Sequence, residues 1–389
     1  MTDEIGFGLE FKPARLKWSE FGQGAIGAGA AEMDFGTAPV VRDAVYEAID
    51  TGLHGYLPAS IAADVRVASA RWQADRYGWI VDANDIRLVP DAVTALSLVI
   101  EHFTEPATPI VVPTPAYPRF VNVARTLGRP VVPVGLVRKW GGYRYRVDEI
   151  ERAFERGGGG LLVLCNPHNP TGFVAGTKDL LEISEVVARH AGRVFADELH
   201  GPLVYSPKDH VPYASLSANS ARHSVTVVST SKAWNLSGLK CSEVILTNPL
   251  DKDRWDQSDR LQLSTNATST LGAVAAAAAY TSGGPWLDSV RSHLLRNRAI
   301  VDDFARLDLP GSRYRTPDAT FLAWLDVSRV LDIAGDPARY FLDRAQVAVA
   351  DGRTFGPGGE GFVRLNFATS TSVLVRALER MRRSIGSLR

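Results

Sequence analysis

Lys232 follows a β-branched run, residues 224–228, that we expect to form a buried strand. Two serines, Ser229 and Ser231, stand just before it, and a second cation, Lys240, lies a few residues further on. A lysine amine in such surroundings suits covalent chemistry beside a bound anion, because amines form Schiff bases with carbonyl compounds. A solvated loop lysine is the commoner reading of such a segment, so the prediction depends on partners elsewhere in the chain.

Two more polar residues stand where predicted strands end. Asp197 follows the apolar strand 194–196, and Asn169 lies in a proline-rich turn after the strand 161–164. A carboxylate beneath an apolar strand needs a cation or a donor, and the protonated pyridine nitrogen of pyridoxal 5'-phosphate (PLP) is one. Each residue also has a plain structural alternative, since aspartate caps helices and Asn-Pro pairs occur in ordinary turns.

Two further loops could bind parts of a cofactor. The strand 86–89 leads into a helix that starts near Ala92, and free amides at a helix N-terminus suit a phosphate group. Asp91 is equally well explained as the N-cap of that helix, and its charge is unfavourable beside a dianion. Tyr117, after the strand 110–112, could stack on a planar cofactor or be a packed core tyrosine.

Alternating strands and helices must position these residues. The predicted strands of the main sheet are 86–89, 110–112, 131–134, 161–164, 194–196, 224–228 and 244–246. The predicted helices between and before them are 39–51, 61–77, 92–102, 119–127, 148–156 and 177–191. This alternation is typical of an α/β protein with a mostly parallel sheet covered on both faces.

From about residue 284 the pattern changes to α+β. We expect helices at 286–307, 337–345 and 371–384 and strands at 320–325 and 362–367. This part is predicted to form a smaller second domain, joined by the N-terminal segment.

The composition sets broad limits on function. The 389-residue chain is formally neutral, with a pI near 7.1, which gives no global electrostatic case for nucleic acid or an anionic membrane as a partner. Its longest small-apolar run, residues 271–280, is too short to span a bilayer, and the N-terminus has no secretion signal. With only two cysteines, the sequence favours a soluble cytoplasmic protein. We predict no metal site.

Five motifs in order carry a resemblance to a known family. They are residues 31–35 (AEMDF), 54–56 (HGY), 165–172 (CNPHNPTG), 197–200 (DELH) and 230–235 (TSKAWN). Together they resemble the fold-type I PLP-dependent enzymes of the class I/II aminotransferase superfamily. Within it, the chain is most similar to the cystathionine β-lyase, or carbon–sulfur lyase, subgroup. The resemblance runs from about Leu16 to the C-terminus.

The resemblance implies a fold and a set of site residues. It implies a large domain, 46–283, with a mostly parallel seven-stranded sheet between helices, a small α+β domain, 284–389, and an N-terminal segment, 1–45, that packs with the small domain. Lys232 would be the catalytic residue that holds PLP covalently. The other cofactor contacts would be Asp197 at the pyridine nitrogen, Asn169 at the phenolic oxygen, Tyr117 stacked on the ring, His200, and, at the phosphate, Ser229, Ser231, Lys240 and the amides of Ala92 and Val93. Tyr56 would reach the phosphate of the neighbouring subunit, which implies a homodimer with shared sites.

The resemblance also implies a reaction. Arg364, with Asn169, would bind the substrate α-carboxylate, since a planar guanidinium suits that group. Lys232 would take the α-proton, and the substrate would lose a thiol, giving pyruvate and ammonia, as in the cleavage of L-cystathionine to homocysteine in methionine and sulfur amino acid metabolism. The first alternative is an aminotransferase, but His200 stands where aminotransferases usually carry tyrosine. The second is a regulatory interaction protein with secondary catalysis.

Overall fold

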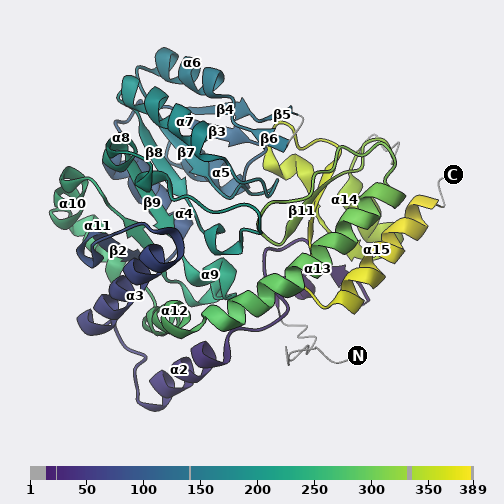
Figure 1. Ribbon diagram of the computed structural model, residues 1–389, viewed down its shortest axis with the longest axis horizontal. Helices are drawn as coiled ribbons and strands as arrows, with labels where there is room; N and C mark the ends of the chain where they lie inside the picture. The colour runs from purple at the N-terminus through teal and green to yellow at the C-terminus, as the bar shows by residue number, and fades with distance from the viewer. Residues whose placement is uncertain (1–14, 23, 140–141, 331–334, 387–389) are drawn as a thin grey trace.

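A seven-stranded sheet forms the centre of the protein (Figure 1). The structure, a computed structural model, describes residues 15–22, 24–139, 142–330 and 335–386. The strands are β2 (Ile86–Val89), β3 (Ile110–Thr114), β4 (Val131–Gly135), β7 (Leu161–Cys165), β8 (Arg193–Asp197), β9 (Ser224–Val228) and β10 (Ser242–Ile245). Each lies within two residues of a strand predicted from the sequence, so the α/β prediction is confirmed.

The sheet is mixed, in the order β2-β10-β9-β8-β7-β3-β4. Strands β4, β3, β7, β8 and β9 run parallel, whereas β10 is antiparallel to both its neighbours, with Glu243 opposite Val228 and Ser242 opposite Val89. The carboxyl ends of β7, β8 and β9 therefore lie side by side at one edge, where ligands bind in open α/β sheets.

Helices cover both faces of this sheet because its central strands are apolar on both sides. In β7, Val163 belongs to one buried cluster and its neighbour Leu164 to another, as the two-residue period of a strand requires. The first cluster includes residues of α4 (Ala92–Phe103) and α5 (Pro118–Thr126), and the second includes residues of α6 (Val147–Gly157) and α7 (Thr177–Arg189). Three more helices, α2 (Pro39–Asp50), α3 (Ala59–Tyr77) and α12 (Thr270–Ser282), pack together.

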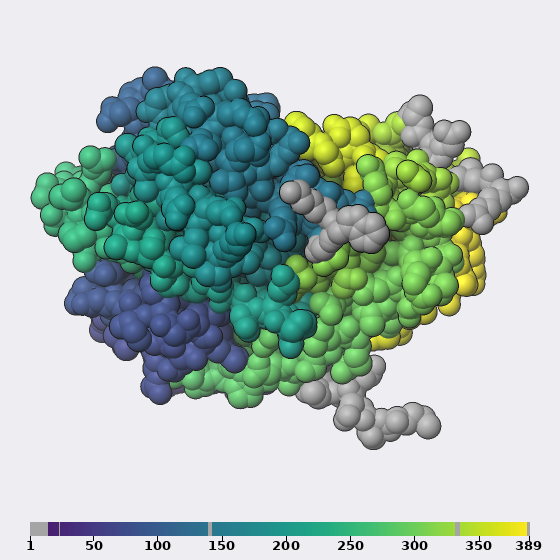
Figure 2. All heavy atoms as spheres, turned by 45° about the horizontal axis from the view of Figure 1, so that its top comes forward, coloured from purple at the N-terminus to yellow at the C-terminus, as the bar shows by residue number. Residues whose placement is uncertain are grey.

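The C-terminal part has its own antiparallel sheet, built from β11 (Leu322–Asp326), β14 (Phe362–Asn366) and β13 (Ala350–Asp351). The helices α13 (Gly284–Asp308) and α15 (Thr371–Gly386) pack against each other beside it. In Figure 2 this part, light green and yellow, gathers at one end of the molecule.

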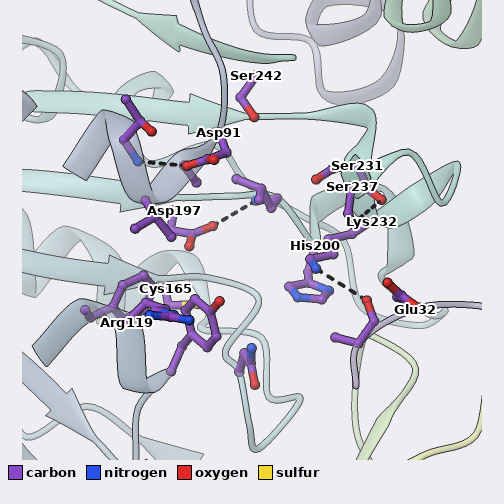
Figure 3. Close-up of a pocket in the computed structure, with 18 of the residues that line it drawn as sticks. Glu32, Asp91, Arg119, Cys165, Asp197, His200, Ser231, Lys232, Ser237 and Ser242 are labelled. Carbon is purple, nitrogen blue, oxygen red and sulfur yellow. Dashed lines mark hydrogen bonds between the residues drawn. The ribbon is translucent and has the colours of Figure 1, made fainter. Parts of the chain in front are cut away.

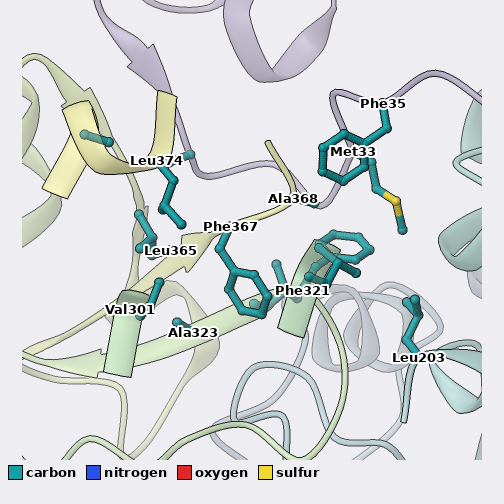
Figure 4. Packing of buried hydrophobic residues seen from close by; sticks show 14 of the residues in the cluster. Met33, Phe35, Leu203, Val301, Phe321, Ala323, Leu365, Phe367, Ala368 and Leu374 are labelled. Carbon is teal, nitrogen blue, oxygen red and sulfur yellow. The ribbon is translucent and has the colours of Figure 1, made fainter. Parts of the chain in front are cut away.

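The N-terminal segment joins the C-terminal part. Strand β1 (Ile26–Gly27) pairs in parallel with β12 (Val347–Ala348). Met33 and Phe35 then enter the same buried cluster as Phe321 and Phe367 (Figure 4). The predicted domain boundaries themselves stay predictions.

The remaining α-helices and strands of the described residues are short. They are α1 (Leu16–Ser19), the hairpin β5 (Val137–Lys139) and β6 (Gly142–Arg144), α8 (Ala218–His223), α9 (Thr230–Ala233), α10 (Pro249–Asp256), α11 (Asp259–Asn266) and α14 (Pro337–Tyr340). The helix predicted at 337–345 is a single α-helical turn that continues as a π-helical turn, Phe341–Ala345. Among the described residues, no helix is both long and apolar enough to cross a membrane.

Candidate active site

A cavity of about 670 Å³ opens at the carboxyl ends of the central strands (Figure 3). Residues from several distant parts of the chain line it, including Asp197 at the end of β8 and Lys232 on α9. The two side chains on which the sequence prediction depends therefore face the same cavity.

Lys232 lies one turn beyond β9, on the short helix α9. Its Nζ donates to the carbonyl oxygen of Ala31, from the N-terminal segment, at 3.4 Å. Burial and, to a smaller extent, the positive charge of Arg364 lower the pKa of this amine, the carboxylate of Asp197 opposes the decrease, and the resulting pKa is about 8. A substantial fraction of the amine is therefore neutral near physiological pH, which is the form that attacks carbonyl groups.

Asp197 ends β8 with its side chain buried in the cavity wall. Its Oδ1 accepts a hydrogen bond from the backbone N–H of Leu199 at 3.2 Å. Burial raises the pKa of the carboxyl to about 6, although that hydrogen bond and the charge of Lys232 act in the opposite direction. Such a carboxylate gains stability from any cation that enters the cavity.

Arg364 and Asn169 meet between the two sheets. Arg364 lies on β14 and is 6% exposed, yet its Nη1 donates to Asn169 Oδ1 at 3.0 Å and its Nη2 to the carbonyl oxygen of Gly29 at 2.8 Å. Burial lowers the pKa of the guanidinium to about 10, so it remains a cation at neutral pH. The structure thus brings together the two residues predicted to bind a substrate carboxylate.

The start of α4 forms another part of the wall. Asp91 caps this helix by accepting from the N–H of Thr94 at 2.8 Å, and its other oxygen pairs with Lys240 Nζ at 2.9 Å. Burial acts to raise the pKa of Asp91, but the hydrogen bonds from Lys240 and Thr94 outweigh it and lower the pKa. Ala92 and Val93 also line the cavity, at the positive end of the helix dipole.

The two serines before Lys232 have different positions. Ser231 lines the cavity, as predicted for a phosphate contact. Ser229 is not among the lining residues: its hydroxyl donates to the carbonyl oxygen of Cys241 at 2.9 Å and accepts from the N–H of Ser231 at 3.1 Å. Ser229 therefore stabilises the turn that carries the lysine, as the N-cap of α9.

Two rings border the cavity. Tyr117 is half-buried at the start of α5 and packs edge-on against Phe120, with ring centroids 5.5 Å apart. His200 is 4% exposed, and burial, followed by the charges of Lys232 and Arg364, lowers its pKa to about 3. The imidazole is therefore neutral at physiological pH.

Tyr56 does not line the cavity of its own chain. It lies in the loop between α2 and α3 and is 95% exposed. Its predicted contact would have to be made in another subunit, and the prediction stays untested.

Sequence reasoning missed two charged lining residues, Glu32 and Arg119. Both were within reach of the motifs, since Glu32 lies inside the 31–35 motif and Arg119 follows Tyr117 by two residues. The sequence does not reveal that these two side chains point toward the cavity, because their orientation depends on how the N-terminal segment and α5 pack (Figure 3).

Comparison with known proteins places this geometry in a family. The family model described as "Aminotransferase class I and II" matches residues 24–381. The chain therefore belongs to this family, and the fold is that of the fold-type I enzymes predicted from the motifs.

Individual relatives are similar over nearly their whole length. A protein of Corynebacterium glutamicum named cystathionine beta-lyase is 36% identical over 94% of this chain and 95% of its own. Among solved structures, a putative PLP-dependent beta-cystathionase of Corynebacterium diphtheriae has a TM-score of 0.89 and 36% identity over 96% of both chains. Cystalysin of Treponema denticola, whose structure contains pyridoxal 5'-phosphate, has a TM-score of 0.90 and 26% identity over 97% of both chains.

Proposed function

We propose that this protein is a PLP-dependent carbon–sulfur β-lyase that cleaves L-cystathionine, or a related cysteine S-conjugate, into a thiol, pyruvate and ammonia. With cystathionine the thiol is homocysteine. The observation that carries the proposal is that Lys232 and Asp197 line one cavity together with Arg364 and Asn169. The similarity to a protein named cystathionine beta-lyase supports this substrate class.

The residues present fit PLP. The buried carboxylate of Asp197, with a raised pKa, suits a cationic ring nitrogen, and the lowered pKa of Lys232 suits a covalent bond to an aldehyde. The amides of Ala92 and Val93 at the start of α4, with Lys240 nearby, suit a phosphate. Asn169 and Tyr117 remain available for the ring.

The side chains of the protein account for the remaining steps. When bound, PLP supplies an electron sink for the α-carbon of an amino acid. Arg364 would bind the substrate α-carboxylate through its planar fork of donors. Lys232 would then take the α-proton, and its pKa of about 8 is close to the operating pH that favours a general base. Loss of the thiol from the β-carbon completes the elimination, and one water molecule then hydrolyses the released aminoacrylate to pyruvate and ammonia.

We further propose that the protein is a cytoplasmic homodimer that acts in sulfur amino acid metabolism, including methionine biosynthesis. The exposed Tyr56 supports a shared site, because it stands apart from the cavity of its own chain. The domains would be 46–283 and 284–389, with the segment 1–45 packed against the second.

One assay tests the reaction. The purified holoenzyme is incubated with L-cystathionine in the absence of any keto acid, and pyruvate and homocysteine are measured. Both products are expected for elimination. An aminotransferase would turn over only after a keto acid is added, and it would convert that keto acid into an amino acid. A purely regulatory protein would form no product under either condition.

A further inference from the structure

Acidic and basic side chains gather around the cavity of the candidate active site. Besides His200, three acidic and four basic residues line it: Glu32, Asp91, Asp197, Arg119, Lys232, Lys240 and Arg364. Lys240 Nζ lies 2.9 Å from a carboxylate oxygen of Asp91, so these two charges form an ion pair. Three basic residues of the lining are left to account for.

Two of these three have a role in the proposed reaction. Burial, followed by the charge of Arg364, lowers the pKa of Lys232. The carboxylates of Asp197 and Glu32 act in the opposite direction, so their charges lie near the lysine. Arg364 would bind the substrate α-carboxylate. Arg119, the third, forms no ion pair within the ranges that the structure describes, and the proposed reaction does not yet use it.

The place of Arg119 in its helix gives no structural reason for an arginine. It is the second residue of α5, after Pro118 and the N-cap residue Tyr117. The helix dipole disfavours a cation at this end, and the first turn contains no acidic residue to offset the charge. Phe120 and Ala124 are the buried residues of α5, whereas Arg119 is exposed. Neither the dipole nor packing in the core therefore favours an arginine here.

The guanidinium of Arg119 lies near the region where a substrate would bind. Burial raises the pKa of the Tyr117 hydroxyl, and the charges of Arg119 and then Arg364 act to lower it. Both guanidinium groups therefore lie close to one hydroxyl. Figure 3 shows Arg119 and Glu32 on opposite sides of the cavity. A substrate held at Arg364 thus has a second cation before it, one without a neighbouring carboxylate in the described lining.

We propose that Arg119 binds a carboxylate on the leaving half of the substrate, the half that departs as the thiol. This inference rests on the proposed β-lyase function. L-Cystathionine has such a group, because its homocysteine half carries a second amino acid carboxylate. Arg364 would bind the carboxylate of the half that becomes pyruvate, and Arg119 that of the half that leaves. Arginine suits the task because its planar fork can donate two parallel hydrogen bonds to one carboxylate.

This contact would set the preference among cysteine S-conjugates. A conjugate whose leaving half carries a carboxylate is attracted to the guanidinium, whereas one whose leaving half carries only an ammonium group is repelled. Arg119 would therefore act on substrate choice, and the chemistry at the α-carbon would be left to Lys232.

Three substrates that differ only in the leaving half test the proposal. S-carboxypropyl-L-cysteine, with its carboxylate at the end of the chain, lacks only the distal ammonium group of L-cystathionine. S-aminopropyl-L-cysteine, with its amine at the end of the chain, lacks only the distal carboxylate. Pyruvate is the common product of all three. In the wild-type holoenzyme, kcat/KM should be at least about fivefold higher for the carboxypropyl than for the aminopropyl conjugate.

Two substitutions should change this ratio in different ways. Arg119→Gln should bring the ratio close to one, and kcat/KM for L-cystathionine should fall at least about fivefold. Arg119→Glu should reverse the preference, because the new carboxylate attracts the ammonium group. Arg119 is exposed, and its cation opposes the dipole of α5, so both variants are expected to fold.

Affinity gives a readout that does not depend on turnover. Lys232→Ala lacks the proposed base, so calorimetry on this variant with PLP bound measures conjugate binding without cleavage. The carboxypropyl conjugate should bind at least about fivefold more tightly than the aminopropyl conjugate, and the difference should disappear in Lys232→Ala/Arg119→Gln.

The control is Arg125→Gln, at an exposed arginine of the same helix outside the cavity, and it should keep the wild-type ratio. An effect on the cofactor or on Tyr117 alone would change all three kcat/KM values by one factor. An unaltered ratio in Arg119→Gln therefore overturns the proposal, as do equal kcat/KM values for the two analogues in the wild type. Absence of pyruvate from all three substrates would instead overturn the β-lyase function, and this inference with it.

Discussion

Arg364 Nη1 donates to Asn169 Oδ1 at 3.0 Å, across 195 positions of sequence. Arg364 comes from the C-terminal sheet and Asn169 from the turn after β7, so this hydrogen bond joins the two sheets at the cavity. The second donation, from Nη2 to Gly29, fixes the N-terminal segment at the same point. The orientation of the guanidinium therefore depends on three separate parts of the chain.

Replacing this arginine with lysine tests its geometry rather than its charge. Arg364→Lys keeps a cation but cannot donate to Asn169 and Gly29 at the same time as it binds a carboxylate in bidentate fashion. We expect KM for L-cystathionine to rise by about tenfold or more, measured from the initial rate of pyruvate formation. Arg353→Lys, at an exposed arginine on the nearby turn, is the control. An unchanged KM in Arg364→Lys would remove this residue from the substrate site.

Asp197 should make the cofactor-free protein less stable at neutral pH. The pKa of its carboxyl is about 6 in the folded protein and 3.8 ordinarily, as in the unfolded chain. Between these two pH values the folded protein therefore binds the proton more tightly than the unfolded chain does. Stability contributed by this group therefore falls as pH rises through that window, by up to about 3 kcal/mol, and the loss is complete above it.

Asp197→Asn avoids that loss. The cofactor-free variant should have a higher free energy of unfolding than the wild type near neutral pH, and the difference should vanish below about pH 4. Urea denaturation of both proteins across this range measures it. Lower stability of the variant at neutral pH would show that the carboxylate is satisfied without a cofactor.

Cofactor capture should follow the titration of Lys232. Only the neutral amine attacks an aldehyde, so the rate of PLP incorporation into the cofactor-free protein should rise with pH and level off above about 8. Stopped-flow absorbance measures this rate, and a free lysine derivative, whose rate keeps rising toward its ordinary pKa, is the control. A protein rate that also keeps rising past pH 8 would mean that the amine is solvated.

Asp91 should weaken phosphate binding by electrostatic repulsion. It pairs with Lys240 and caps α4, so its carboxylate lies close to the predicted phosphate position. Asp91→Asn keeps the cap and removes the charge, and PLP affinity should increase by about tenfold in an equilibrium titration. The control is Asp82→Asn, at a capping aspartate outside the cavity. Weaker PLP binding in Asp91→Asn would place the phosphate elsewhere.

The proposed sharing of sites between subunits can be tested by mixing two inactive variants. Lys232→Ala lacks the amine, and Tyr56→Ala lacks the side chain expected to reach the neighbouring site. If each site uses Lys232 of one subunit and Tyr56 of the other, half of the randomly mixed dimers have one intact site. About a quarter of the wild-type activity should then return after subunit exchange, measured at limiting PLP. No recovery, despite demonstrated exchange, would place both residues in the same subunit's site.

Local patterns in the sequence were enough to predict the seven strands of the main sheet, most of the long helices, and the places along the chain of Lys232, Asp197, Asn169 and Arg364. Apolar periodicity reports whether a residue faces a core, and that property belongs to a few consecutive residues. The motif order then identified the family, because its five segments are each short and continuous.

Only the tertiary structure decided where the polar side chains point. Ser229 and Ser231 are two residues apart, yet one hydroxyl stabilises a turn and the other residue lines the cavity. The pairing of Asp91 with Lys240 likewise joins segments that are 149 positions apart in sequence. The physical reason is that hydrogen bonds and charge pairs form between groups that folding brings within about 3 Å. Local periodicity in the sequence does not predict contacts between residues that are far apart along the chain.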